Sequence, residues 1–132
     1  MYNLKDYIVV LKNIVPDELC DAILAEYVKS SEWEHTVIGL GQVDKTRRNC
    51  NTIQMSQPFV IQDNKERVRL DAEMFKYAAK CIEEYNKKFE HVHIKEDTGY
   101  ELLRYNEGEF YIQHVDSFLQ APRLVSCSFH LN

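Results

Sequence analysis

The sequence predicts a mixed α+β fold in one domain. Two stretches place apolar residues at the three- and four-residue spacing of a helix, and several shorter stretches alternate or cluster like strands. No internal repeat, low-complexity tract or Gly- and Pro-rich linker divides the 132 residues. We therefore expect a single domain over 1–132, in which 1–98 form a mainly helical N-terminal support and 99–132 form the first core strands.

The composition is typical of a soluble globular protein, with 45% hydrophobic and 28% charged residues. The net charge of −5 argues against a broad nucleic-acid-binding face, because such faces need clustered Lys and Arg. The apolar run near the N-terminus is short and lies among Lys5, Asp6 and Lys12, so it matches neither a signal peptide nor a membrane span. We expect a cytoplasmic protein with no nucleic-acid or membrane partner.

The cysteines are widely spaced and form no CxxC pair, which argues against a structural zinc site. Buried free thiols in a reducing compartment are the simplest interpretation. The four residues are Cys20, Cys50, Cys81 and Cys127.

The first element expected is a strand over 7–11, where the run YIVVL is rich in β-branched residues. A helix should follow from Pro16 to about Ser30, because proline fits the first turn and Asp17 and Glu18 suit the positive end of the helix. Its buried stripe has helical spacing. The stripe consists of Leu19, Cys20, Ile23, Leu24, Tyr27 and Val28.

Two short strands are expected next. The first contains Trp33, Val37 and Ile38 and ends at Gly39 and Gly41, and the second covers 50–55. The basic residues between them are most simply a solvated loop. They are Lys45, Arg47 and Arg48.

The longest helix should begin at a cap provided by Asp63 or Asn64 and end near Phe89. Its apolar positions recur at helical spacing, and charged residues fill the other faces. The apolar positions are Val68, Ala72, Phe75, Ala79, Ile82 and Phe89. His91 and His93 follow two residues apart, but no acidic or thiolate partner is spaced to complete a metal site, so we interpret them as a helix-exit loop.

The stretch 99–116 predicts two strands joined by a tight turn at Asn106, Glu107 and Gly108, the second strand ending at His114-Val115-Asp116. Side chains two apart on a strand share a face, so His114 and Asp116 should project together. An imidazole and a carboxylate supply two of the three ligands of a two-His-one-carboxylate Fe(II) site. The same tripeptide also fits an incidental surface pair.

A last strand is expected over 124–131, where apolar and polar residues alternate. Val125, Cys127, Phe129 and Leu131 would pack on the core. Ser126, Ser128 and His130 would either face water or line a polar cavity that also contains His114 and Asp116.

The residues around His114 belong to a wider pattern, which resembles the iron(II)- and 2-oxoglutarate-dependent dioxygenases of the prolyl 4-hydroxylase type. Their usual run is Arg-Tyr, a Gly turn, Tyr-x-x-His-x-Asp and an Arg-led strand ending in Leu-Asn. The match is strongest over 99–132 and extends loosely to the N-terminus. Its residues are Leu103-Arg104-Tyr105, Gly108, Tyr111, His114, Asp116, Phe118, Arg123 and Leu131-Asn132.

The resemblance implies a double-stranded β-helix (a jelly-roll or cupin-like core) with the N-terminal helices packed on one side. It implies that His114 and Asp116 bind Fe(II) and that Tyr105 contacts the co-substrate 2-oxoglutarate. His130 stands where many members have a tyrosine that contacts the co-substrate, and Ser128 shares its face. Tyr111 would line the site or orient the substrate, although strand parity places it opposite His114 and favours a packed aromatic.

The implied activity is hydroxylation of a protein or peptide side chain, stimulated by ascorbate. The segment containing the basic residues near Arg48 would then lie at the mouth of the site, where it can contact substrate. In this family a distal His ligand and a Lys or Arg co-substrate anchor follow the Leu-Asn pair. Since the sequence ends at Asn132, we expect an incomplete core that is marginally stable or associates through its open edges.

Two other interpretations stay open. One is a related oxygenase with another substrate, such as a nucleic-acid demethylase, which the acidic balance disfavours. The other is a non-catalytic jelly-roll binding module in which His114 and Asp116 are incidental.

Overall fold

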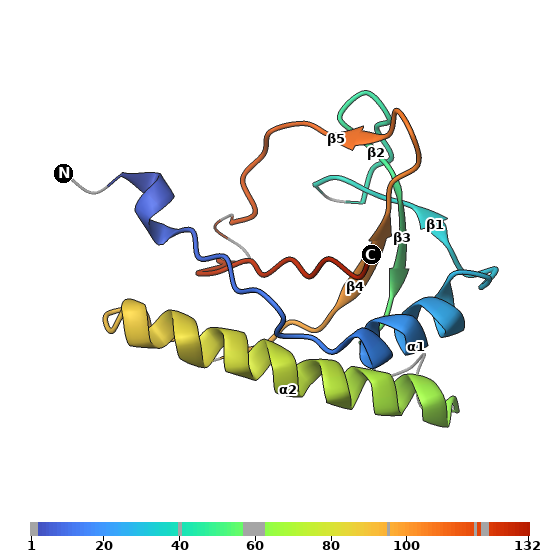
Figure 1. The fold of residues 1–132 in the computed structure, drawn as a ribbon. Helices are drawn as coiled ribbons and strands as arrows, with labels where there is room; N and C mark the ends of the chain where they lie inside the picture. Colours follow the sequence, from blue (N-terminus) through green and yellow to red (C-terminus); the bar gives the residue numbers. More distant parts are fainter. Residues whose placement is uncertain (1–2, 40, 57–62, 95, 118, 120–121) are drawn as a thin grey trace.

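The fold is mixed α+β, as the sequence predicts. The computed structural model describes residues 3–39, 41–56, 63–94, 96–117, 119 and 122–132 (Figure 1). Within these residues two α-helices pack beside two small antiparallel sheets, and the strands form neither a closed barrel nor a jelly roll. The coarse fold class is therefore confirmed.

The two sheets are separate. The larger has the order β1-β3-β4 and the smaller pairs β2 with β5. In Figure 1 the larger sheet rises from the helices, and the smaller sheet lies at the end of the molecule away from them. The elements are a 3₁₀-helix at Leu4–Tyr7, α1 at Asp17–Tyr27, β1 at Glu34–His35, β2 at Arg48–Asn49, β3 at Asn51–Gln54, α2 at Lys65–Lys88, β4 at Glu101–Arg104 and β5 at Phe110–Tyr111.

Both predicted helices are confirmed. Helix α1 begins after Pro16, has Asp17 and Glu18 in its first turn, and ends at Tyr27, three residues before the predicted Ser30. Helix α2 is capped by Asn64, whose side-chain oxygen accepts hydrogen bonds from the N–H groups of the second and third helical residues. The stretch containing His91 and His93 follows the helix as a loop, as predicted.

The predicted strand over 7–11 is wrong. Asn3 caps the short 3₁₀-helix instead, through a reciprocal pair of hydrogen bonds with the main chain and carboxylate of Asp6. Residues 8–11 belong to no strand, and Ile8 and Val10 are 65% and 78% exposed. A β-branched run forms a strand only where a neighbouring strand can pair with it and bury one face, and no described strand pairs with this segment.

The other predicted strands are shorter than expected. The strand expected around Trp33 to Ile38 is only the two residues of β1. Before it, the Trp33 indole donates to the Tyr27 carbonyl (2.8 Å) at the end of α1, and after it Ile38 forms an isolated bridge with Gln42. The strand expected over 50–55 is confirmed as β3. The strand expected over 124–131 is wrong, since residues 125–132 carry no strand pairing.

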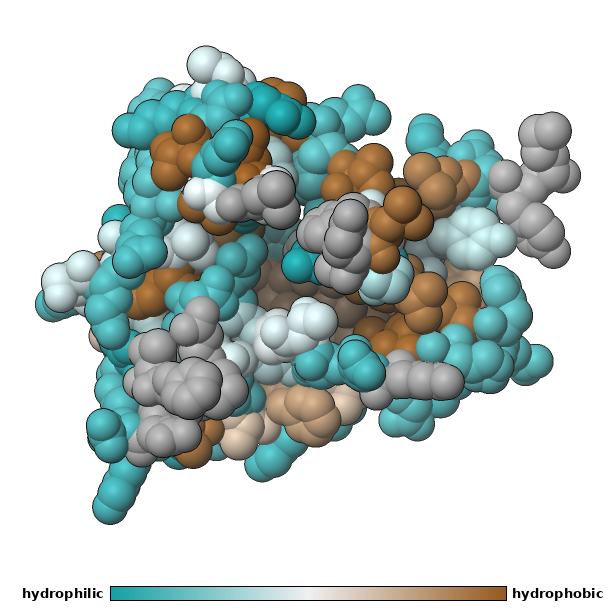
Figure 2. Space-filling model, turned by 180° about the vertical axis from the view of Figure 1, so that it is seen from behind, coloured by the Kyte–Doolittle hydropathy of each residue, from teal (hydrophilic) through white to brown (hydrophobic). Residues whose placement is uncertain are grey.

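The core joins the helices to the larger sheet and to the C-terminal segment. Phe129 and Leu131 pack against it, so part of the predicted alternation survives without a strand. On the face turned away in Figure 1, apolar side chains are visible in a central hollow between hydrophilic ones (Figure 2). The buried core residues are Leu19, Ile23, Tyr27, Ile53, Met55, Leu70 and Met74.

The four cysteines are free, as predicted, but they are not all buried. Cys20 and Cys50 are buried, Cys81 is half-buried and Cys127 is exposed. Cys127 therefore departs from the apolar face expected for it, because the strand that would have buried that face does not form.

Gly99 allows the chain just before β4 to approach the end of β3 closely. Its φ is +83°, and a Cβ at this position would lie 2.7 Å from the Cβ of Ser56. The Gly99 N–H also donates to the Asp97 carboxylate (2.7 Å), which fixes the turn before the strand. This close approach lets β4 pair with β3 and lead toward the loop that contains His114.

We expect Gly99→Ala to lower the free energy of unfolding by more than about 2 kcal/mol, since left-handed backbone alone costs roughly 1–2 kcal/mol for a residue with a Cβ. Gly108→Ala is the matched control, because its φ is +80° but nothing lies within 4 Å of the added Cβ. Gly108→Ala should lower the free energy of unfolding, measured in urea, by only about 1 kcal/mol. Equal losses would show that the Ser56 contact is irrelevant.

Candidate metal centre

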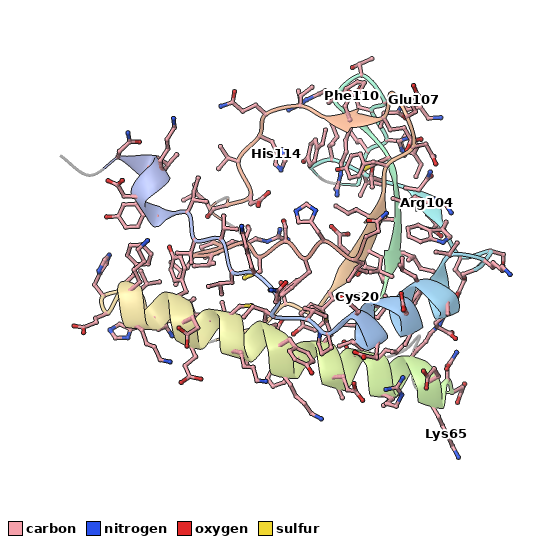
Figure 3. All side chains as sticks on the ribbon, in the orientation of Figure 1. Cys20, Lys65, Arg104, Glu107, Phe110 and His114 are labelled. Carbon is pink, nitrogen blue, oxygen red and sulfur yellow. The ribbon has the colours of Figure 1, made fainter. Side chains whose placement is uncertain are left out.

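His114, labelled in Figure 3, lies in the loop that leaves β5 and not on a strand. Asp116 lies in the same loop. The predicted turn between the two strands is present, but β4 joins one sheet and β5 the other, and β5 ends at Tyr111. The two side chains nevertheless meet, with His114 Nε2 and Asp116 Oδ1 3.0 Å apart. The predicted proximity holds, while the strand parity offered as its cause does not.

The His114 ring has an acceptor at each nitrogen. Nδ1 lies 2.9 Å from the Ile112 carbonyl oxygen, and Nε2 faces the Asp116 carboxylate. A neutral imidazole has one N–H and can donate only once. With Nδ1–H donating to the carbonyl, the Nε2 contact becomes favourable only with a second proton or with a cation between the two groups.

The Asp116 carboxylate is held in its charged form. The Ser126 hydroxyl donates to Oδ2 (2.6 Å), and this hydrogen bond is the main reason that the pKa of Asp116 lies below its usual value. The charges of His114 and Arg123 lower this pKa further. Ser126 belongs to the polar face of the C-terminal segment, and its contact with Asp116 agrees with the interpretation in which that face lines a cavity with His114 and Asp116.

The donor pair fits a divalent metal ion. Two ligands at right angles around a six-coordinate ion, each about 2.1 Å away, lie about 3.0 Å apart. His114 Nε2 and Asp116 Oδ1 have this separation, which is also that of an ordinary His–Asp hydrogen bond or ion pair. The side chains are 34% and 41% exposed, so an ion can reach them. In the described part of the chain, no group of three or more His, Cys, Asp or Glu side chains is placed to hold a metal. The pair can therefore supply two ligands.

Tyr111 lies directly on His114. The two rings are stacked with centroids 3.6 Å apart and an angle of 13° between their planes. The parity argument that placed Tyr111 opposite His114 is wrong, because β5 ends at Tyr111 and the chain turns before His114. Tyr111 thus borders the site.

Tyr105 directly follows β4, and its phenol lies near Tyr111, Arg48 and Cys50. Burial raises its pKa to about 12, with a further rise from the Cys50 thiol, while the nearby Arg48 charge opposes the rise. The phenol therefore stays neutral at physiological pH and can donate a hydrogen bond. The residue as a whole is 46% exposed, and within the described residues no hydrogen bond joins it to His114 or Asp116.

Ser128 and His130 are not brought to the metal pair. Both are exposed, and within the described residues neither forms a hydrogen bond or ion pair with His114 or Asp116. Phe118, part of the pattern on which the resemblance rests, lies outside the described residues.

Arg48 is the residue of the basic segment 45–48 that contacts the site, and the sequence did not separate it from its basic neighbours. Its guanidinium lies over the Tyr111 ring (4.6 Å to the centroid), donates to the Val37 carbonyl (3.1 Å) and pairs with Glu101 (3.5 Å). Its side chain is only 14% exposed, whereas Lys45 and Arg47 are exposed as expected of a solvated loop. No local pattern distinguished Arg48 from these neighbours.

Comparison with protein-family models, with curated protein sequences and with solved structures finds no match to this chain. In the part of the chain that the structure describes, neither helix has the length and apolar character needed to cross a bilayer.

Proposed function

We propose that this chain carries the first part of the catalytic domain of a cytoplasmic Fe(II)- and 2-oxoglutarate-dependent hydroxylase of the prolyl 4-hydroxylase type, acting on a protein or peptide side chain. The 3.0 Å separation of His114 Nε2 and Asp116 Oδ1 is the observation that carries the proposal. The order Arg-Tyr, Gly turn, Tyr-x-x-His-x-Asp supports it. The two antiparallel sheets would be parts of the opposed sheets of a double-stranded β-helix.

Each residue of the proposed site would have a separate role. His114 and Asp116 would hold Fe(II), and the Ile112 carbonyl and Ser126 hydroxyl would orient them. Tyr105 would donate a hydrogen bond to the bound co-substrate. Iron held there would activate O₂, which is the oxidant that hydroxylates a C–H bond and converts 2-oxoglutarate to succinate and CO₂.

The metal pair is tested by titrating the chain with Mn²⁺, an air-stable probe, and following the free ion by electron paramagnetic resonance. One weak site is expected, and His114→Ala and Asp116→Ala should each weaken binding at least about tenfold. His93→Ala is the control, since this histidine lies in the loop after α2. Equal binding by all four proteins would refute the metal pair.

Hydroxylation is tested on the complete gene product. Its reading frame should continue past Asn132 to a histidine followed by a lysine or arginine, and the purified protein should form succinate from 2-oxoglutarate with Fe(II) and ascorbate. His114→Ala should abolish succinate formation. A stop codon directly after Asn132, or a metal-loaded protein with no turnover, would refute the hydroxylase and favour the binding module.

A further inference from the structure

Three side chains form a continuous stack beside the metal pair. The Arg48 guanidinium lies 4.6 Å from the centroid of the Tyr111 ring, and the Tyr111 ring lies 3.6 Å from the His114 ring at 13°. Arg48 and Tyr111 are also direct partners in the register of β2 and β5. The pairing of the smaller sheet therefore sets the first contact of the stack.

Arg48 is the fixed end of this stack. One guanidinium nitrogen donates to the Val37 carbonyl (3.1 Å) and another lies 3.5 Å from Glu101 on β4. Glu101 in turn accepts from Thr52 (3.1 Å) and Gln54 (3.3 Å) on β3. Arg48 thus connects the larger sheet to the loop that carries His114.

His114 needs such support. Its side chain is 34% exposed, and one backbone carbonyl holds Nδ1. A single hydrogen bond allows the ring to tilt, which would move Nε2 away from Asp116. A flat neighbour at 3.6 Å blocks this tilt, because a tilted ring would collide with it.

We propose that Arg48 is a positioning residue for the metal pair: it holds Tyr111 flat against His114 and so keeps Nε2 directed at Asp116. A guanidinium over an aromatic face is attracted by the ring quadrupole and matches its flat shape. The metal arm of this inference rests on the proposed function, but the order of the His114 ring can be measured without any metal.

The change in metal affinity on removing Arg48 tells whether Arg48 acts by positioning His114 or only through its charge. A cation near the site repels a metal ion, so a role through charge alone predicts that removing Arg48 strengthens metal binding. Positioning predicts that the same change weakens metal binding. The two roles therefore give opposite results for Arg48→Ala.

The test compares Arg48→Ala and Arg48→Lys with Arg47→Ala, which removes the same charge from an exposed neighbouring side chain. In the metal-free chain, the ¹H–¹³C resonances of the His114 ring should lose their ring-current shift in both Arg48 variants, since an ammonium does not stack flat. The Mn²⁺ dissociation constant should rise about tenfold in both. Arg47→Ala should match the unaltered protein in both measurements.

Tyr111→Leu keeps the test decisive if the Arg48 variants fail to fold. It removes the ring through which Arg48 would act on His114, so the Mn²⁺ dissociation constant should rise about tenfold, as in the Arg48 variants. Unchanged His114 resonances in Arg48→Ala, or tighter Mn²⁺ binding, would overturn the inference. If the unaltered chain binds no Mn²⁺, the proposed metal site fails, and the ring resonances alone then decide whether Arg48 positions His114.

Discussion

Arg67→Ala is expected to lower the free energy of unfolding by about 3 kcal/mol, the largest loss that we predict for a polar side chain. Arg67 lies in the first turn of α2, and its side chain is only 10% exposed. Its removal leaves a partly buried carboxylate on α1 without a cation, and that uncompensated charge is the main source of the loss.

The contacts of Arg67 explain the size of this effect. Its Nε donates to Glu26 (2.9 Å), one of its terminal nitrogens lies 2.5 Å from Glu32, and its guanidinium lies 4.8 Å from the centroid of the Tyr27 ring. Glu26 also accepts from Asn64, the cap of α2 (3.0 Å). The network thus fastens the end of α1 to the start of α2.

Arg69 is the matched control. It lies two residues further along the same helix and also pairs with two carboxylates, those of Glu66 (2.6 Å) and Glu73 (2.8 Å), but its side chain is 46% exposed. Because solvent screens such pairs, Arg69→Ala should cost less than about 1 kcal/mol in urea unfolding. Similar losses for both arginines would contradict the role given to burial.

The helices were predictable because their signals are local. Pro16 with Asp17 and Glu18 marks the start of α1, and Asn64 marks the start of α2, each within a few residues of the turn it stabilises. The strands were not predictable to the same degree. Every described strand has only two to four residues, and β3 depends on a partner, β4, that lies beyond the whole of α2 in the sequence.

In the candidate site, too, only the contact between residues close in sequence could be predicted. His114 and Asp116 are close in sequence, so their contact could be predicted even though the strand that was expected to align them ends at Tyr111. Arg48 and Ser126 reach the site from distant segments, through sheet pairing and the path of the C-terminal segment. No short motif encodes such contacts. For the same reason Ser128 and His130 were assigned to the site although they do not contact the metal pair.

The second large effect that we predict is self-association of the chain through the open edges of its larger sheet. Strand β4 pairs with β3 alone among the described strands, and β1 is the other edge of its sheet. Several large apolar side chains of the last part of the chain are exposed beyond 40%. Unpaired strand edges beside exposed apolar surface promote pairing between chains. These residues are Leu103, Tyr105, Phe110, Ile112, Val115, Leu119 and Leu124.

We therefore expect the 132-residue chain to self-associate, with an apparent mass in sedimentation that rises with protein concentration and a melting temperature that depends on it. Leu103→Lys places a charge on the edge strand β4 and should shift the chain toward monomer. Val68→Lys is the control, because Val68 is 42% exposed on α2 and belongs to no strand, and should leave association unchanged. A monomer at all concentrations that melts in one sharp transition would show that these edges are already satisfied within one chain.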